Sequence, residues 1–436
     1  MKIYSILVAN RGEIAVRIIR TCRVLGIETI LASSEADIDS TAARLADSTI
    51  VIGPPSSATY LNVEALVEAA IQSRAQALHP GYGFLSEKPE LARSCEENGI
   101  VFIGPKADHI RELGNKLAAR ALAAKCGIPI IPGSEAGSTY DKALCTADEI
   151  GFPIILKAAA GGGGRGMKIV YEEDRSSLKQ LFEEASAEAS AAFGDGTLYV
   201  EKYIANSRHI EVQVLGDKHG AVIHLGERDC STQRRYQKLI EEAGAPGISD
   251  ELRSEIQNAA VQLVSDISYE NAGTVEFIFD RDTQKFYFLE MNTRIQVEHP
   301  VTEMVTGIDI VREQINIASG NKLRFAQNDI KFNGHSIECR INAEDPFDGF
   351  KPTPGVITRW EIPQGPGVRV DTHCYHGYKV PFFYDSLIAK VIVHGDDREH
   401  ARRRMLAALD EFAVEGISTT APFLSKVLES SDFADG

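Results

Sequence analysis

The sequence predicts a mixed α/β fold of two or three domains, and three observations support this prediction. With 436 residues, the chain is longer than one compact domain usually is. Over about the first 114 residues, apolar segments of strand length alternate with amphipathic segments of helix length, a pattern typical of a parallel sheet with helices on both faces. Hydrophobic residues make up 44% of the chain and charged residues 25%, which is an ordinary globular composition.

The first region, residues 1–114, is expected to form a parallel-sheet domain. Its first strand, IYSILVA, is followed by a turn at Asn10–Gly12 and an amphipathic helix from about Glu13 to Leu25. Further strands are expected at 27–32, 49–52, 75–78 and 100–103, and further helices at 62–73 and 87–98. Residues 1–40 lack the G-x-G-x-x-G pattern of a dinucleotide-binding turn, which argues against a nicotinamide enzyme.

Two further regions are expected after the first. A helix from about Asn115 to Cys126 stops at Gly127-Ile128-Pro129 and opens a second α/β region, residues 115–332. The third region, residues 333–436, begins with the strand-like segment HSIECRINAE and has a helix near 397–413.

Charge and cysteine usage exclude several classes of partner and site. The net charge of −16 argues against nucleic acid or an anionic membrane as the main partner. No segment approaches the roughly 18 consecutive apolar residues of a membrane helix. The seven cysteines are scattered without a C-x-x-C pair, so neither a disulfide framework nor a zinc site is expected, and a reducing cytoplasm fits best.

A run of glycines is the strongest local signal. Gly161, Gly162, Gly163, Gly164, Arg165 and Gly166 lie between two strand-like segments, Pro153–Lys157 and Met167–Tyr171. Adjacent glycines let the backbone approach a ligand and direct its amides at an anion. The run lacks the Gly-Lys-Ser/Thr ending of a Walker loop and opens no helix. It therefore predicts a flap over nucleotide phosphates with Lys157 as a nearby cation, the alternative being a flexible surface turn.

Two glutamates in neighbouring strands form the second signal. Gly273–Asp280 and Lys285–Met291 read as a hairpin centred near Thr283, which places Glu276 opposite Glu290. Facing carboxylates repel each other, and their apolar neighbours make an ionised pair costly without a cation. Asn292 adds an oxygen on the same face, and such hard oxygen ligands suit Mg²⁺ bound jointly with ATP phosphates. The alternative is a pair of solvent-facing glutamates.

The same alternation continues beyond the hairpin. Glu290, Asn292, Arg294, Gln296 and Glu298 share parity, so an extended chain would place them on one face. Metal ligands, a cation, an amide and a carboxylate in one row suit an anion activated beside a metal-bound nucleotide.

Three weaker signals have simpler alternatives. Gln233–Lys238 is a basic cluster that is more often a solvated face, and Tyr82 lies in the turn-like segment HPGYG. Arg340 lies among acidic neighbours, so it could form a structural ion pair with Glu338 or Glu344.

Taken together, these segments resemble the biotin carboxylase family of the ATP-grasp superfamily. The matching strings run in order through nearly the whole chain: ILVANRGEIA, HPGYGFLSE, FIGP, KAAAGGGGRGM, VEKY, RHIEVQV, ERDCS, FLEMNTRIQVEHPVTE, ECRINAEDP and YDSLIAK. The resemblance implies a Rossmann-like domain at 1–114, an ATP-grasp domain at 115–332 with a glycine-rich lid at about 131–203, and a C-terminal mixed α/β domain at 333–436.

The resemblance also implies a role for each matching residue. ATP contacts are implied for Lys116, Lys157, Gly161, Gly162, Gly163, Gly164, Gly166, Glu201, Lys202, Ile204, His209, Gln233, Tyr236, Glu276 and Glu290. The Mg²⁺ or Mn²⁺ ligands are implied to be Glu276, Glu290 and Asn292. The bicarbonate pocket is implied to be Lys238, Arg294, Gln296, Val297 and Glu298, and Arg340 is implied to face the ureido group of biotin, with Tyr82 nearby.

The implied reaction has two stages, with Lys238, Arg294, Glu298 and Arg340 as catalytic residues. Glu298 acts as the base for bicarbonate, which attacks the γ-phosphate of ATP to give carboxyphosphate. Carboxyphosphate releases CO₂, and Arg340 stabilises the enolate-like biotin that attacks it. Tyr236 departs from the family, which often has His or Asn at this position of the nucleotide contact.

The implied partners follow from what the sequence lacks. Its only internal Met-Lys pair is Met167-Lys168 beside the glycine run, so biotin is expected on a separate biotin carboxyl carrier protein. Carboxyltransferase subunits and a homodimer are implied as well, with acetyl-CoA carboxylase and fatty acid synthesis as the default setting. The alternatives are another ATP-grasp ligase, such as one forming carbamoyl phosphate or a carboxylated purine, and a catalytically silent regulatory paralogue.

Overall fold

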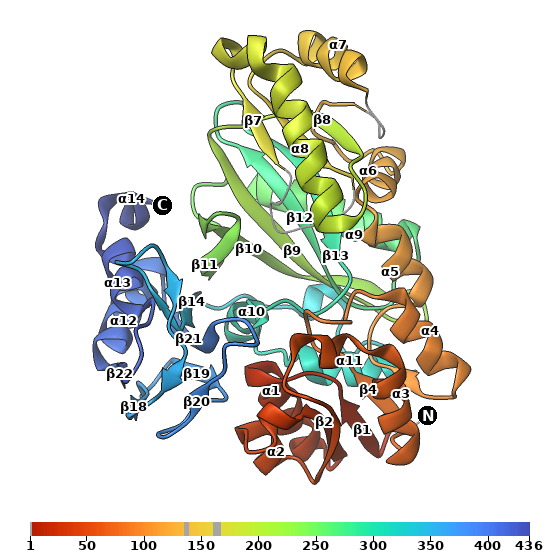
Figure 1. Ribbon diagram of the computed structural model, residues 1–436, viewed down its shortest axis with the longest axis vertical. Coiled ribbons are helices and arrows are strands. Elements are labelled where there is room, and N and C mark those ends of the chain that lie inside the picture. Colours follow the sequence, from red (N-terminus) through yellow and green to blue (C-terminus); the bar gives the residue numbers. More distant parts are fainter. Residues whose placement is uncertain (1, 135–138, 160–166) are drawn as a thin grey trace.

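The N-terminal region of the computed structural model, which describes residues 2–134, 139–159 and 167–436, is built on a parallel sheet (Figure 1). Its strand order is β3-β2-β1-β4-β5. The strands are β1 (Ser5–Val8), β2 (Glu28–Ser34), β3 (Ser48–Gly53), β4 (Ala77–His79) and β5 (Val101–Phe102). All of its pairings are parallel, so the α/β prediction for this region is confirmed.

Alternate residues of β1 face two different layers of helices. Ile6 and Val8 belong to a core cluster with α1 (Gly12–Leu25), whereas Leu7 packs with α3 (Val63–Gln72) and α4 (Pro89–Glu97). This arrangement explains why the strand is apolar from Ile6 to Val8, because both of its faces are covered.

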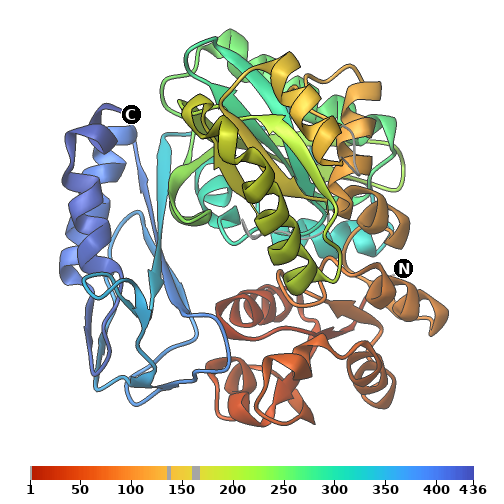
Figure 2. The same cartoon turned by 45° about the horizontal axis from the view of Figure 1, so that its top comes forward.

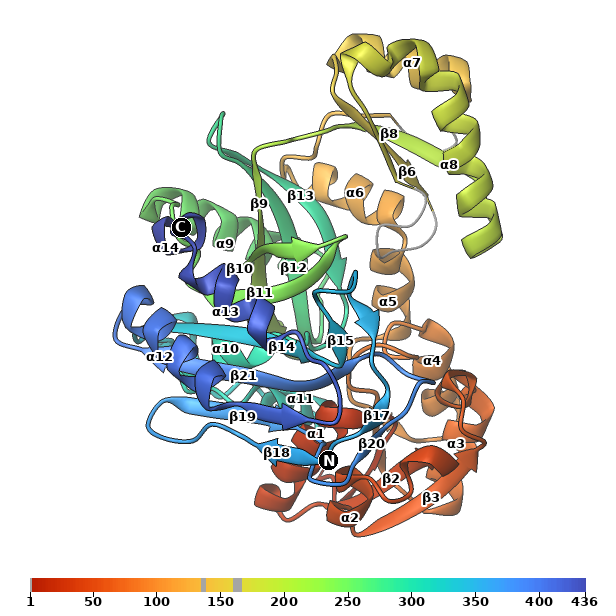
Figure 3. The same ribbon diagram turned by 60° about the vertical axis from the view of Figure 1, so that its left-hand side comes forward.

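A single eight-stranded antiparallel sheet forms the centre of the molecule. Its order is β13 (Lys285–Asn292), β12 (Asn271–Asp280), β9 (Ser207–Gly216), β10 (Val222–Arg234), β11 (Gln237–Ala243), β14 (His335–Asn342), β21 (Leu387–Gly395) and β19 (Val368–Thr372). The pairing of β11 with β14 carries the sheet across the boundary predicted at 332/333. The two regions therefore share one continuous sheet, which Figure 3 shows as the green and blue strands side by side.

A smaller sheet of three strands projects from the rest of the molecule (Figure 3). It consists of β7 (Lys168–Val170), β6 (Ile154–Ala158) and β8 (Leu198–Lys202), covered by α7 (Tyr140–Ile150) and α8 (Leu178–Phe193). The strands β6 and β7 pair antiparallel, as predicted for the segments that flank the glycine run. The run itself, Gly161–Gly166, lies outside the described residues.

The predicted hairpin is confirmed, including its register. β12 pairs with β13, and Glu276 lies opposite Glu290. The longer alternation is only partly right, because the strand ends at Asn292 and residues 293–298 lead through a turn into α10 (His299–Thr306). Arg294, Gln296 and Glu298 are therefore placed by this connection and not by one extended face.

Helices cover both faces of the sheet near its C-terminal strands. On the outer face α12 (Arg398–Glu411) and α13 (Ala421–Glu429) pack on β14 and β21, and Figure 2 shows these helices in dark blue at the edge of the molecule. On the other face, Val301 and Val305 of α10 pack against Ile392 of β21. Among the helices that the structure describes, none is long and apolar enough to cross a membrane.

The remaining helices join these layers. The predicted helix after the first region is α6 (Lys116–Lys125), which Asn115 caps through its side chain. It follows α5 (Ala107–Gly114), while α9 (Asp250–Asp266) packs on the central sheet and α11 (Ile310–Ala318) packs in the core cluster of α1.

Candidate active site

A cavity of about 900 Å³ lies where the N-terminal region, the central sheet and the C-terminal region meet. Its walls combine apolar and charged side chains from all three regions, as ligand cavities usually do. The predicted residues that line it are Tyr82, Lys116, Lys157, Lys202, Ile204, His209, Gln233, Tyr236, Lys238, Glu276, Glu290, Asn292, Arg294, Gln296, Val297, Glu298 and Arg340. The structure thus brings together nearly all of the described residues that the sequence singled out.

Glu201 differs from the other predicted residues because it does not line this cavity. It is buried, and its carboxylate accepts hydrogen bonds from Lys157 (2.6 Å) and Arg120. Its side chain therefore holds Lys157 in place at the cavity wall.

Glu276 collects more donors than its hairpin partner. Its oxygens lie 2.6 Å from His209 Nε2, 3.1 Å from Lys238 Nζ and 2.8 Å from Asn292 Nδ2. Burial alone would raise its pKa, but Lys238 and His209 hold the pKa of Glu276 below its ordinary value. Glu290, by contrast, is partly exposed and pairs with Lys116 at 3.3 Å.

The oxygen atoms of this hairpin fit a divalent cation. Two carboxylates face each other on paired strands, and Asn292 lies two residues beyond Glu290, with its amide nitrogen on Glu276 and its amide oxygen accepting from Arg294 Nη2 at 3.0 Å. Binding of a cation by the Asn292 oxygen would therefore require the amide to turn over. Two carboxylates and an amide oxygen are the hard ligands that Mg²⁺ prefers. His209, Glu211 and Glu276 also bring three possible ligand atoms within 4.8 Å of one another, but Lys238 already donates to both glutamates.

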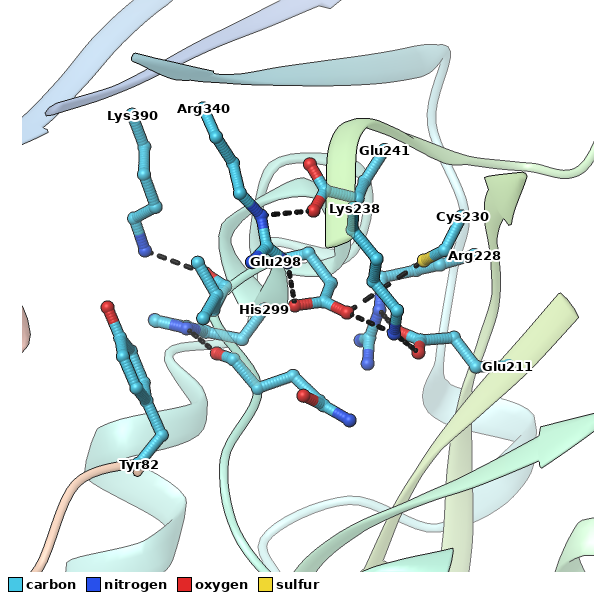
Figure 4. A network of polar contacts seen from close by, with 12 residues as sticks. Tyr82, Glu211, Arg228, Cys230, Lys238, Glu241, Glu298, His299, Arg340 and Lys390 are labelled. Atoms are coloured by element: carbon cyan, nitrogen blue, oxygen red, sulfur yellow. Dashed lines mark hydrogen bonds and ion pairs between the residues drawn. The ribbon is translucent and has the colours of Figure 1, made fainter. Parts of the chain in front are cut away.

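Glu298 lies at the centre of the charged side chains (Figure 4). It is fully buried and lies 2.7 Å from Lys238 Nζ and 3.0 Å from Arg340 Nη2. It is also the N-cap residue of α10, where the helix dipole favours a negative charge. Burial opposes ionisation, yet Lys238, Arg340 and Arg228 together hold the pKa of Glu298 well below its ordinary value. The carboxylate is therefore ionised at neutral pH.

Arg340 has different ion-pair partners from those that the sequence suggested. It pairs with Glu241 on the neighbouring strand β11 and with Glu298, and not with Glu338 or Glu344. The alternative of an ion pair with Glu338 or Glu344 is therefore not what the structure shows. Arg340 lines the cavity from β14, while Tyr82 comes from the N-terminal region on the opposite side (Figure 4).

Arg294 and Val297 are held by residues that sequence reasoning missed. Arg294 Nε donates to Glu87 at 2.9 Å, and Lys390 Nζ donates to the carbonyl oxygen of Val297 at 2.7 Å. Lys390 also pairs with Glu13, which accepts from the Tyr82 hydroxyl. The sequence did contain a signal for Lys390, because this lysine interrupts the otherwise apolar strand LIAKVIV.

Lys238 is held in position by a buried ion pair. Arg228 and Glu211 are both fully buried and pair with each other, and Glu211 also accepts from Lys238 at 2.6 Å. Arg228 further donates to Thr302 of α10 at 3.0 Å. These residues were missed, although an isolated charge between apolar residues, as in RHIEVQV, marks such a site.

Gln233 and Tyr236 lie on the hairpin of β10 and β11. Gln233 Nε2 donates to the carbonyl oxygen of Cys230 at 2.7 Å and contacts His209 Nδ1 at 3.1 Å. Tyr236 occupies the turn, with a positive φ of 66° and half of its surface exposed at the cavity wall.

Family models match three consecutive segments of the chain. They are the biotin carboxylase N-terminal domain (residues 2–110), the ATP-binding domain of the carbamoyl-phosphate synthase L chain (115–326) and the biotin carboxylase C-terminal domain (338–436).

Similar proteins match along the full length. A pyruvate carboxylase subunit of Methanothermobacter thermautotrophicus is 52% identical over 99% of this chain and 88% of the relative. Biotin carboxylase 1 of Bacillus subtilis is 51% identical over 100% of this chain and 96% of the relative. The crystal structure of the biotin carboxylase–βγ-ATP complex from Campylobacter jejuni is 49% identical, with a TM-score of 0.97 over 100% of this chain and 97% of that one. This chain therefore belongs to the biotin carboxylase family of ATP-dependent ligases.

Proposed function

We propose that this chain uses ATP and bicarbonate to carboxylate biotin held on a separate biotin carboxyl carrier protein, through carboxyphosphate. The observation that carries the proposal is the position of Glu298, buried between Lys238 and Arg340 at the wall of the cavity. A buried carboxylate flanked by two cations can take a proton from a bound acid while the cations hold the resulting anion.

In the proposed first stage, Arg294 and Lys238 bind bicarbonate and Glu298 removes its proton. Glu87 orients the guanidinium of Arg294, and Lys390 fixes the backbone carbonyl of Val297. Bicarbonate then attacks the γ-phosphate of ATP, so that carboxyphosphate and ADP form. A divalent cation, Mg²⁺ or Mn²⁺, held by Glu276, Glu290 and Asn292 would neutralise charge on the transferring phosphoryl group.

We propose that ATP lies against the wall formed by Lys116, Lys157, Lys202, Ile204 and His209. In this proposal Glu201 acts indirectly, because it orients Lys157. Gln233 and Tyr236 would border the nucleotide, and Gly161–Gly166 would cover its phosphates. The Campylobacter jejuni structure is described as a βγ-ATP complex, and that of a 49% identical Hydrogenobacter thermophilus 2-oxoglutarate carboxylase domain is described as a complex with MgADP and bicarbonate.

In the proposed second stage, carboxyphosphate releases CO₂ and phosphate, and phosphate takes the proton from the ureido nitrogen of biotin. Arg340 stabilises the negative charge on the ureido oxygen, and Tyr82 borders the same space. The ureido nitrogen then attacks CO₂ to give carboxybiotin.

The proposed setting is an acyl-CoA carboxylase, with acetyl-CoA carboxylase as our first choice, working in the cytoplasm with carboxyltransferase subunits. Two relatives are named for pyruvate carboxylase and 2-oxoglutarate carboxylase, so pyruvate and 2-oxoglutarate are the competing acceptors. We also propose a homodimer, because the Hydrogenobacter structure is described as a dimer. The proposed domains are 1–114, 115–332 with a lid at about 131–203, and 333–436.

Release of ADP tests the proposed function directly. Purified protein with Mg·ATP should release ADP only when bicarbonate is present, and free biotin should increase the rate. ADP release that ignores bicarbonate would instead favour another ATP-grasp ligase, and no release at all would favour a silent paralogue. Isolation of the chain with its bound carrier and transferase, followed by a test of each acceptor, would identify the acceptor.

A further inference from the structure

Two buried glutamates face each other directly behind Arg340. Glu241 of β11 lies opposite Glu338 of β14 in the antiparallel ladder, and both are completely buried. Residues paired in this way point to the same face of the sheet, with Cβ atoms about 5 Å apart. Glu241 was not singled out from the sequence, and Glu338 was named there only as an alternative ion-pair partner of Arg340.

Three of the four carboxylate oxygens in this pair have no hydrogen-bond donor. Glu241 Oε1 accepts from Arg340 Nε, but Glu241 Oε2 and both oxygens of Glu338 are buried without a partner. A buried carboxylate without donors loses its hydration and gains nothing in return. Two such carboxylates in contact would also repel each other.

The neighbouring charges do not remove this conflict. Besides Arg340, Lys390 of β21 is a cation near the two glutamates. Its Nζ, however, donates to the carbonyl oxygen of Val297 and pairs with Glu13 of α1. Lys238 donates to Glu211, Glu276 and Glu298. Arg340 forms its ion pairs with Glu241 and Glu298, so it does not pair with Glu338. His299 of α10 is buried and cannot supply a further positive charge. Burial is the main cause that lowers its pKa well below the ordinary value, and the nearby cations Lys390, Arg17 and Arg369 lower it further, so His299 is neutral.

We propose that Glu338 and Glu241 share one proton, so that Glu338 is a carboxylic acid whose O–H donates to Glu241 Oε2. One proton then supplies a donor and an acceptor for two of the three unpartnered oxygens. It also leaves a single negative charge behind Arg340, matched by the guanidinium.

The electrostatic environment agrees with this arrangement. Burial is the main cause that raises the pKa of Glu338 well above its ordinary value. The positive charges of Lys390 and Arg340 oppose this shift, the negative charges of Glu241 and Glu298 add to it, and the net direction is upward. Burial likewise raises the pKa of Glu241 to about 7, although Arg340 opposes the shift. The two groups titrate together, so one proton belongs to the pair.

The shared proton has a consequence for Arg340 that rests on the proposed function. With the proton present, Arg340 faces two anions, Glu241 and Glu298; without it, the ionised Glu338 would be a third. The extra anion would draw the guanidinium away from the cavity and weaken its hold on the ureido oxygen. Glu338 is therefore a positioning residue, and loss of its proton should slow biotin carboxylation at alkaline pH.

The pH dependence of stability tests the shared proton without any substrate. Glu338 binds its proton in the folded chain but releases it in the unfolded chain above about pH 4.5, so rising pH should destabilise the wild type. Glu338→Gln keeps a donor towards Glu241 and carries no titrating proton. Between pH 6 and 8 the folding equilibrium constant of the wild type should fall about tenfold per pH unit relative to that of Glu338→Gln.

Asp37→Asn is the control for loss of a buried carboxylate that carries no shared proton. Asp37 pairs with Arg11 and accepts from the Tyr60 hydroxyl, and its pKa is lowered, so its removal should destabilise the protein equally at pH 6 and pH 8. A difference between wild type and Glu338→Gln that stays constant over this range would contradict the shared proton.

Infrared difference spectra provide a second measurement of the shared proton. It can be made on the wild type even if a variant is poorly stable. The wild type at neutral pH should show the C=O stretch of a buried protonated carboxylic acid, and Glu338→Gln should lack it. Absence of this band in the wild type would overturn the proposal.

The catalytic consequence is tested separately. Biotin carboxylation by the wild type should decline at alkaline pH more steeply than carboxylation by Glu338→Gln, while ATP cleavage without biotin should show no such difference. Identical profiles, with the stability and infrared results as expected, would refute the role towards Arg340 but leave the shared proton in place. If the wild type shows no bicarbonate-dependent ATP cleavage at all, the proposed function itself is refuted.

Discussion

At the scale of single residues, the site depends on compensated buried charge. Glu298 and Lys238 lie 2.7 Å apart in a buried cluster, and each retains its charge because the other is present. A cation beside a buried carboxylate keeps it ionised, and this is what a base that works at neutral pH requires.

Replacement of Lys238 should therefore change the pH dependence as well as the rate. Because Lys238 is the largest of the influences that lower the pKa of Glu298, Lys238→Gln should raise that pKa and protonate the base at a higher pH. The acid limb of bicarbonate-dependent ATP cleavage should then move to higher pH than in the wild type. A variant that is slower but has an unmoved acid limb would show that Lys238 does not control the base.

Site residues could be predicted from the sequence only where neighbouring residues in the same segment marked them. Lys238, Arg294 and Glu298 lie in segments that were recognised, whereas Glu241 was not, because its importance comes from the pairing of β11 with β14. Those strands are nearly one hundred residues apart, and alternation within one strand cannot predict which strand lies beside it.

At the scale of elements, the hairpin of β12 and β13 is the best-predicted part of the site. Its two strands are joined by a short polar turn, so the pairing of Glu276 with Glu290 could be predicted, although the structure reaches it through a one-residue register shift between Glu276 and Phe277. The prediction failed beyond Asn292, because the chain there turns towards α10, which begins at His299 with Glu298 as its N-cap residue, and side-chain alternation does not apply in a turn.

Glu290→Gln tests the metal-binding role of this hairpin. The change removes a ligand charge but keeps the size and leaves the fold intact, so turnover at limiting Mg²⁺ should fall at least about tenfold and recover partly at high Mg²⁺. Lys285→Gln at the exposed start of the same strand is the control and should keep the wild-type Mg²⁺ dependence. Equal Mg²⁺ dependence of both variants would show that the hairpin is only structural.

At the scale of the whole molecule, the cavity exists because three regions converge. The central sheet joins the second and third regions through β11 and β14, and the N-terminal region contributes Tyr82 and Glu13. The parallel sheet of the first region was predictable from the alternation of strands and helices. The contacts between the three regions were not, since the sequence gives no register between distant segments.

The link between Lys390 and Glu13 should hold two of these regions together. Lys390 is fully buried, and its loss would leave Glu13 buried without its cation and the carbonyl of Val297 without a donor. Lys390→Met should therefore lower the free energy of unfolding by about 3–5 kcal/mol. Lys379→Met, at an exposed position of the same region, should change it by less than about 0.5 kcal/mol. Similar values for the two variants in urea unfolding would refute the link.

The most direct test of the whole account separates the two stages at Arg340. If Arg340 stabilises the ureido oxygen, Arg340→Ala should reduce biotin carboxylation on the order of 10²–10³-fold, the usual loss for one preorganised donor. Bicarbonate-dependent ATP cleavage without biotin should fall much less, because it depends on Lys238, Arg294 and Glu298. Both rates and the melting curve are measured on one preparation. Equal loss of both activities together with a lowered melting temperature would contradict the account and leave Arg340 as an ion-pair partner of Glu241.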